Sequence, residues 1–172
     1  YALASADNRL TGRLKLKADA AYNSANTPVK ALNQNVYAHE YNLAAEYRHS
    51  SATQIGAGIG LMDFDDGNLR KSANVWMNNL LYQYDRWQLG SKLWADYSAN
   101  KDIPEAHYYN PKNSKSLSGT LQLSYTAPLD NGISLKQTVS GGAGRYWQSG
   151  VAAENTWNLS YGHDWQFGRK TS

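Results

Sequence analysis

Eight segments of this chain alternate between apolar and polar residues with a period of two, which limits the folds available to it. Residues 10–22 show the pattern clearly, with Leu14 and Leu16 on one parity and Lys15 and Lys17 on the other. Successive side chains of a β-strand point to opposite faces, so each segment predicts a strand with one apolar and one polar face. No segment keeps the period of about 3.6 residues that a helix needs. The segments span residues 10–22, 41–47, 54–61, 76–84, 87–97, 117–125, 133–143 and 157–167.

The connections between these segments alternate in length. Asp85-Arg86 is a two-residue turn that places Tyr84 opposite Trp87, as a hairpin requires. Residues 50–52 and 128–132 are also short, whereas residues 23–35, 63–68, 98–114 and 144–155 are expected to form longer loops. Short turns at one end and long loops at the other are typical of outer-membrane barrels, with the short turns in the periplasm.

The composition excludes several classes of protein. The chain has no cysteine, which excludes a disulfide scaffold and a cysteine-based zinc site. No stretch is long and apolar enough for a membrane-spanning helix. Basic residues are scattered and the net charge is only +3, so no nucleic-acid partner is expected. The 13 Tyr and 6 Trp, against 2 Phe, are instead rings that favour membrane–water interfaces. Many of them lie near segment ends: Tyr22, Tyr47, Tyr84, Trp87, Tyr97, Tyr125, Trp157 and Trp165.

A soluble barrel or sandwich would show the same alternation, with its apolar parity in the core and its polar parity in water. The polar parity here is mostly Gly, Ser, Thr, Gln and Asn, with less Lys and Glu than soluble surfaces usually carry. The sequence therefore predicts one all-β domain over residues 1–172, an antiparallel up-and-down transmembrane β-barrel in the bacterial outer membrane.

The barrel is expected to be larger than the strands visible here. A spanning sheet must close so that every backbone group is paired, but a barrel of about eight strands is filled by its own side chains. Residues 2–4 resemble the end of a preceding strand, residues 5–9 a periplasmic turn, and residues 168–172 a turn into a further strand. The chain is thus interpreted as part of a barrel of about 16 strands. The alternative is a small closed barrel ending at Phe167, which would act as an adhesin or structural anchor.

Motifs for catalysis or cofactor binding are not found. Residues 63–67 resemble the start of a calcium loop, but the glycine comes one place early and no Glu closes the loop. Gly56, Gly58 and Gly60 have the wrong spacing for a dinucleotide-binding turn, and predict clearance inside a lumen or close backbone approach. The four histidines lie on separate segments without metal-ligand spacing. We therefore expect no enzyme activity, no catalytic residue, no metal and no cofactor.

The polar parity predicts the lining of a path. Trp94 lies on this parity and should project into the lumen, where a flat ring among hydrogen-bonding groups suits a sugar polymer. Packing against a plug or a neighbouring strand would explain Trp94 equally well. The expected lining residues are Asp19, Glu40, Glu46, Lys92, Trp94, Asp96 and Asp164.

Three stretches carry a resemblance to a known family: residues 108–113 (YYNPKN), 142–150 (GAGRYWQSG) and 159–165 (LSYGHDW). They resemble the C-terminal barrel of the poly-β-1,6-N-acetyl-D-glucosamine export porins (PgaA/HmsH type). The resemblance is most specific over residues 107–167. It implies an outer-membrane barrel through which a partly deacetylated biofilm polysaccharide leaves the cell. We expect the extended polymer to thread through it passively.

The resemblance also implies partners. The partners are the polysaccharide, the outer-membrane lipid and, through regions absent from this chain, a periplasmic deacetylase and an inner-membrane synthase. The family implies a negatively biased passage, whereas the polar parity here is mixed in charge. A porin for another polysaccharide such as cellulose is the alternative within this class. An extracellular vestibule or loop constriction is expected from four aromatic residues, for which ordinary loop packing is equally plausible: Tyr108, Tyr109, Tyr146 and Trp147.

Overall fold

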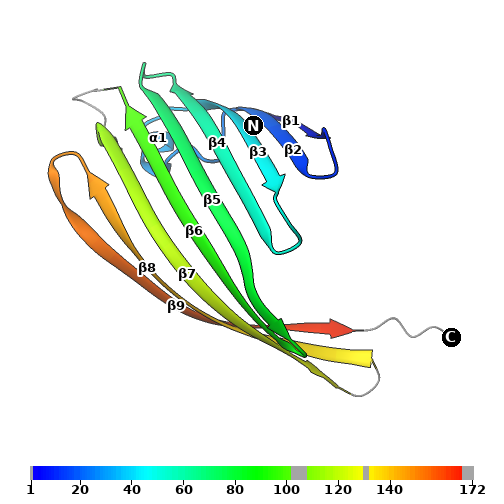
Figure 1. Ribbon diagram of the computed structural model, residues 1–172. Coiled ribbons are helices and arrows are strands. Elements are labelled where there is room, and N and C mark those ends of the chain that lie inside the picture. Colours follow the sequence, from blue (N-terminus) through cyan, green and yellow to red (C-terminus); the bar gives the residue numbers. More distant parts are fainter. Residues whose placement is uncertain (1, 102–107, 130–131, 168–172) are drawn as a thin grey trace.

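The computed structural model of the protein describes residues 2–101, 108–129 and 132–167, and these form one antiparallel sheet of nine strands (Figure 1). Each strand pairs with its neighbours in the sequence, so the order across the sheet runs from β1 to β9. The predicted all-β, up-and-down fold is confirmed. The strands are β1 (Ala2–Arg9), β2 (Leu14–Tyr22), β3 (Ala38–Arg48), β4 (Thr53–Phe64), β5 (Leu69–Tyr84), β6 (Trp87–Asn100), β7 (Asn113–Pro128), β8 (Ile133–Gln148) and β9 (Val151–Phe167).

Strand β1 corrects the prediction for the start of the chain. Residues 5–9, expected as a turn, pair with β2, and the turn lies at residues 10–13. The polar residues of this stretch face partners on β2: Ser5 lies opposite Asp19, and Asp7 forms an ion pair with Lys15. Polarity alone therefore suggested a turn where cross-strand pairing favours a strand. The turn predicted at residues 168–172 lies outside the described residues.

The connections alternate between the two ends of the sheet. The short-turn end carries the connections at residues 10–13, 49–52, 85–86 and 129–132. The opposite end, called here the loop end, carries those at residues 23–37, 65–68, 101–112 and 149–150. The long loop expected over residues 144–155 is wrong, because β8 and β9 extend into it and leave a two-residue turn. Gly150 has a φ of +79°, which a tight turn needs and glycine adopts at no steric cost.

A single helical turn, α1 (Val29–Leu32), lies in the β2–β3 connection, where no helix was predicted. Pro28 precedes it with a φ of −56°, which suits the start of a helix. Four residues are too few for a helical period to be visible in the sequence. Within the described ranges, no helix is long and apolar enough to cross a membrane.

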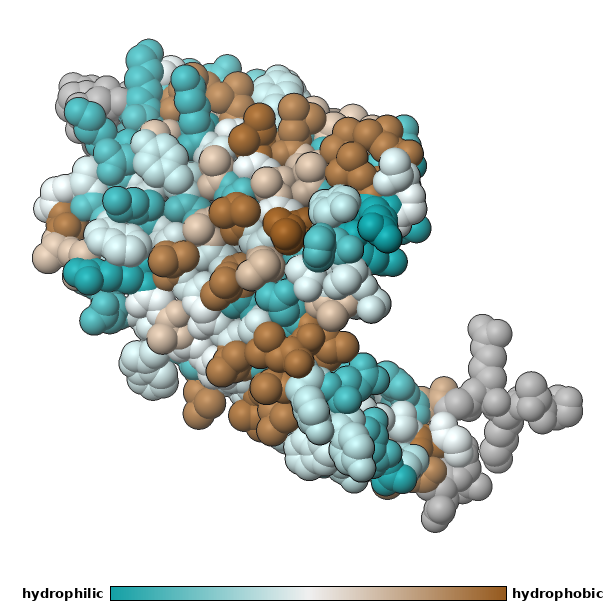
Figure 2. Space-filling model, in the orientation of Figure 1, coloured by the Kyte–Doolittle hydropathy of each residue, from teal (hydrophilic) through white to brown (hydrophobic). Residues whose placement is uncertain are grey.

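The strand register gives the sheet two different faces. Directly opposed residues share a face: Leu43 lies opposite Ile59 on one, and Asn42 lies opposite Gly60 on the other. The face of Leu43 and Ile59 is called the apolar face, and the face of Asn42 and Gly60 the polar face. Large apolar side chains are exposed on the first, whereas Ser124, on the second, is only 3% exposed. Figure 2 shows apolar groups gathered over the middle of the molecule. This is the reverse of a soluble sheet and fits an apolar face that contacts lipid.

Aromatic side chains of the apolar face gather near both ends of the strands. At the short-turn end, the rings of Trp87 and Tyr125 lie 4.7 Å apart between centroids. At the loop end, Tyr22 stacks on His39 at 4.5 Å. Rings at these two levels have the positions of interfacial girdles. Trp157 differs, because it lies opposite Ala143 well inside the strand.

A β-bulge in β5 overturns one face assignment. In the sequence, alternation over residues 76–84 places Trp76 and Leu80 on the same parity as Tyr82 and Tyr84, which predicts one shared apolar face for all four. The pairing with β6 skips one residue between Leu80 and Tyr82. An extra residue in one strand reverses the parity beyond it, so Trp76 and Leu80 lie on the polar face while Tyr82 and Tyr84 lie on the apolar face.

The described strands form an open sheet in which β1 and β9 are the two edges. An open edge leaves unpaired backbone N–H and C=O groups, which hydrocarbon does not tolerate. The arrangement therefore fits the prediction of a partial barrel, whose edges pair with further strands in the membrane.

The face assignment predicts the effect of a charge on the apolar face. Leu121 lies in the middle of β7 with 56% of its surface exposed. Leu121→Arg should destabilise the membrane-inserted barrel by about 2–4 kcal/mol, because the guanidinium would face lipid. Urea unfolding in lipid vesicles measures this. The control is Gln122→Arg on the polar face, which should cost much less, and equal costs for both variants would contradict the assignment.

Candidate functional site

The centre of the polar face holds three predicted path residues in one cluster. Lys92, Trp94 and Asp96 alternate along β6 and so share this face. The Trp94 Nε1 donates a 3.1 Å hydrogen bond to Asp96 Oδ1, and the Lys92 Nζ lies 5.1 Å from the Trp94 ring centroid. Ser116 Oγ donates to the same carboxylate oxygen. The cluster therefore presents an aromatic ring with a cation on one side and an anion on the other.

Trp76 is a second tryptophan of this cluster, which sequence reasoning missed. It lies directly opposite Trp94 on the neighbouring strand and opposite Gly56 on the other side. A Cβ added at Gly56 would lie 2.3–2.5 Å from three atoms of the Trp76 indole, so the ring covers the glycine. A bulge is not visible in an alternation pattern, and only its recognition could have placed Trp76 on the polar face.

The glycine row of β4 makes room for the side chains of β5. Gly58 faces the Asn74 amide, since a Cβ there would lie 3.1 Å from Asn74 Nδ2. Gly60 faces Ser72, whose Oγ would lie 2.5 Å from an added Cβ. The clearance predicted from the glycine pattern is therefore occupied by β5 side chains that lie close to the sheet.

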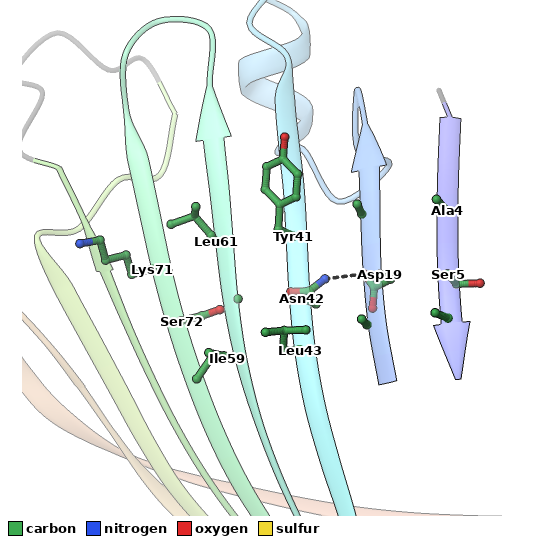
Figure 3. A pocket seen from close by; sticks show the side chains of 14 residues that line it. Ala4, Ser5, Asp19, Tyr41, Asn42, Leu43, Ile59, Leu61, Lys71 and Ser72 are labelled. Carbon is green, nitrogen blue, oxygen red and sulfur yellow. Dashed lines mark hydrogen bonds between the residues drawn. The ribbon is translucent and has the colours of Figure 1, made fainter. Parts of the chain in front are cut away.

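Three predicted carboxylates lie on β2 and β3, where neighbouring groups hold them. Asn42 Nδ2 donates to Asp19 Oδ2 at 2.8 Å (Figure 3) and to Glu40 Oε1 at 3.0 Å. Ser24 Oγ also donates to Glu40 at 2.5 Å. Glu46 is paired with Lys17, with 2.5 Å between Nζ and Oε1. The charge of Glu46 is therefore compensated, whereas Asp19 and Glu40 accept these bonds from neutral groups.

Asp164 lies apart from the central cluster. It occupies β9 near the short-turn end, directly opposite Lys136 on β8. The polar face thus carries both signs of charge, as the sequence indicated. Asp164 places its negative charge near the short-turn end of this face, away from Trp76 and Trp94.

Tyr108 packs in an apolar cluster at the loop end of the polar face. The cluster joins α1 and the β6–β7 connection to the ends of β3 and β4, and consists of Ala31, Ala38, Met62, Phe64 and Tyr108.

Two hydrogen bonds fix the Tyr108 hydroxyl, which donates to Asp66 Oδ2 at 2.8 Å and accepts from Asn68 Nδ2 at 2.9 Å. Burial, reinforced by the Asp66 carboxylate, raises the pKa of Tyr108 to about 12. The residue is 6% exposed, so the loop packing that competed with the vestibule prediction describes Tyr108 better.

Tyr109 reaches from the same connection to β8. Its hydroxyl lies 2.5 Å from the Tyr146 hydroxyl and donates to Gln148 Oε1 at 2.5 Å. Its carbonyl oxygen accepts from Arg70 Nη2 at 3.1 Å. Partial desolvation of this side chain, which stays 56% exposed, and then its hydrogen bond with the Tyr146 hydroxyl raise the pKa of Tyr109 to about 12. Tyr109 and Tyr146 therefore lie together at the loop end of the polar face.

Trp147 does not join them. It follows Tyr146 in β8 and pairs with Lys115 of β7, so strand alternation places it on the apolar face. The vestibule prediction placed Tyr146 and Trp147 together in the loop expected over residues 144–155, whereas β8 extends through both residues and directs them to opposite faces.

Among the residues that the structure describes, no three His, Cys, Asp or Glu side chains are grouped to hold a metal ion.

Comparison with known proteins places this geometry in a family. Residues 3–172 match the family described as the PgaA membrane beta barrel domain. A solved structure titled "Bacterial polysaccharide outer membrane secretin" shares the fold with a TM-score of 0.89 at 17% sequence identity. The match covers 96% of this chain and 57% of that one, so this chain spans little more than half of the neighbour's length. No curated protein matches the chain. The chain belongs to the PgaA membrane beta barrel domain family and is part of a β-barrel of the bacterial outer membrane.

Proposed function

We propose that the polar face lines an aqueous path through which a partly deacetylated poly-β-1,6-N-acetyl-D-glucosamine leaves the cell. Family membership supports a barrel that handles a polysaccharide, and the solved neighbour's title names the same class of polymer. The observation that carries the proposal is the pair of tryptophans, Trp76 and Trp94, side by side on the polar face beside Asp96.

The chemistry of this cluster suits an amino sugar polymer. A pyranose ring has apolar faces that pack on an aromatic ring and polar edges that need hydrogen-bonding partners. Trp76 and Trp94 supply two rings from directly paired positions of β5 and β6, while Asn74 and Ser116, which pair with Asp96 on either side, supply polar groups. Asp96 accepts its described hydrogen bonds from neutral donors, so its negative charge is available to a free amine of a deacetylated residue.

Movement through the path is passive in this proposal. Each sugar exchanges one set of contacts for the next, so every site must bind weakly enough to release its sugar. Asp19, Glu40 and Asp164 extend the row of carboxylates on either side of the cluster, and Tyr109 with Tyr146 lies where the polymer would leave. Engagement of a periplasmic deacetylase and an inner-membrane synthase through other parts of the protein belongs to the same proposal.

Removal of the rings tests the stacking role. Trp94→Ala and Trp76→Ala should each lower the rate of polymer export about two- to tenfold, because an aromatic contact contributes about 0.5–1.5 kcal/mol. Immunoblotting of secreted polymer measures export at matched barrel levels. The control is Trp157→Ala, which removes an 83% exposed ring from the apolar face and should leave export unchanged. Export that is unaffected by both polar-face variants, or lowered equally by the control, would contradict the proposal.

Neutralisation of the carboxylates tests the electrostatic role and the identity of the polymer. Asp96→Asn and Glu46→Gln should reduce export of the amine-bearing polymer while barrel assembly stays intact. Asp96→Asn should act more strongly, because Glu46 is already paired with Lys17. Asp85→Asn in the short turn is the matched control. A neutral polymer such as cellulose carries no amine, so export that does not respond to Asp96→Asn would favour that alternative.

A further inference from the structure

A second binding feature lies on the opposite, apolar face of the sheet. An open groove of about 540 Å³ runs over β5 to β8 near the loop end. Its apolar lining comes from Ala73, Val75, Ala95 and Leu117, with larger side chains of Tyr97 and Trp147 beside them. The small side chains of Ala73 and Ala95 leave the depression, and its place on the apolar face makes an acyl chain a suitable occupant.

Two cationic side chains lie beside the Trp147 ring of this groove. Lys115 lines it, and its Nζ lies 5.3 Å from the centroid of the Trp147 ring. The Cζ of Arg145 lies 5.6 Å from the same centroid. A ring contact leaves the N–H donors of both groups free for an anion. Within the described ranges, neither side chain has a carboxylate within ion-pair distance.

The charge distribution of the apolar face points the same way. Strand parity places Lys71, Lys115 and Arg145 on this face, and all three lie in its loop half. Asp63 is the acidic residue that parity places there among the described strands, and it lies on β4. Two strands separate it from Lys115, a distance of about 14 Å at strand spacing. The face is therefore basic at the loop end and uncharged at the short-turn end.

The depth of the cations matches a lipid headgroup. Lys115 is two residues from the start of β7 and Arg145 three residues from the end of β8, about 7 and 10 Å along the strands. Since short turns face the periplasm in such barrels, the loop end faces outward. We propose that Lys115, Arg145 and Trp147, with the groove beside them, bind a phosphorylated glycolipid of the outer leaflet, its phosphate on the cations and an acyl chain in the groove.

Ordinary snorkelling of basic side chains toward an interface is the competing explanation, and it requires no particular lipid. Lys71 distinguishes the two. It lies on the same face and at the same end, beside a larger groove of about 760 Å³ over β1 to β5 (Figure 3), but the described contacts give it no aromatic partner. If the basic residues had only a general interfacial role, Lys71 and Lys115 would contribute equally to lipid binding. A specific lipid site predicts that Lys115 contributes and Lys71 does not.

The test uses the full-length outer-membrane protein that contains this chain, purified in mild detergent and depleted of lipid. Native mass spectrometry then follows binding of lipid A with two phosphates and of the same lipid after enzymatic dephosphorylation. The site predicts at least tenfold tighter binding of the phosphorylated form. Lys115→Gln and Arg145→Gln should each weaken that binding at least threefold, whereas Lys71→Gln should leave it nearly unchanged.

A further variant separates the contribution of the groove from that of the charges. Ala95→Leu fills part of the groove without changing a charge, and should weaken binding of lipid A. In a separate competition experiment, millimolar inorganic phosphate should fail to displace lipid A from the unmodified protein. Heat-modified gel mobility checks that each variant forms its barrel. Equal binding of both lipid forms, equal effects of Lys71→Gln and Lys115→Gln, or displacement by inorganic phosphate would each overturn the proposal.

Discussion

The pairing of backbone groups in a medium without water determines this structure. Every N–H and C=O that crosses hydrocarbon must find a partner inside the protein, which leaves a closed sheet as the form available to strands. Long antiparallel strands joined in sequence order follow from that requirement. The alternation of side chains then follows from the strand itself, which sends one parity into lipid and the other into an enclosed aqueous space. A soluble sheet satisfies the same backbone requirement with its apolar face hidden. Here Leu43, Ile59 and Leu121 of the apolar face are exposed, whereas Ser114 and Ser124 of the polar face are buried.

The same alternation puts small and large side chains next to each other on the polar face, and this determines the shape of its surface. The glycines of β4 are neighbours of Trp76, Asn74 and Ser72 on β5, whose side chains lie low across the sheet. A larger residue at Gly56 would force the Trp76 ring away from the strand. The shape of the polar face therefore depends on glycines as well as on the residues proposed to contact a sugar. At the loop end, the cluster around Phe64 and Tyr108 covers part of the same face.

Much of this could be predicted from the sequence, because strand periodicity is a local property. The eight segments, the parity of Trp94 and Asp96, and the outer-membrane fold all follow from alternation and loop lengths. The predictions that were wrong share a cause: each depends on a structural feature that the alternation of apolar and polar residues does not reveal. The bulge near Leu81 places Trp76 on the face opposite to the predicted one. The tight turn at Gly150 leaves strand where a loop was expected, so Tyr146 and Trp147 lie on opposite faces. The burial of Tyr108 depends on Phe64, Asp66 and Asn68, which lie 40 to 44 positions earlier in the chain. A pattern of neighbouring residues cannot reveal contacts over such a separation.

The central claim is that the apolar face contacts lipid and the polar face encloses water. Nitroxide spin labels placed singly at Leu121 and Gln122, adjacent residues of β7, test it directly in the full-length protein reconstituted into bilayers. Power-saturation measurements compare collisions with oxygen, which concentrates in lipid, and with a water-soluble nickel chelate. The account predicts that the label at 121 responds mainly to oxygen and the label at 122 mainly to the chelate. A label at 121 that meets the chelate, together with one at 122 that is shielded from it, would contradict the account.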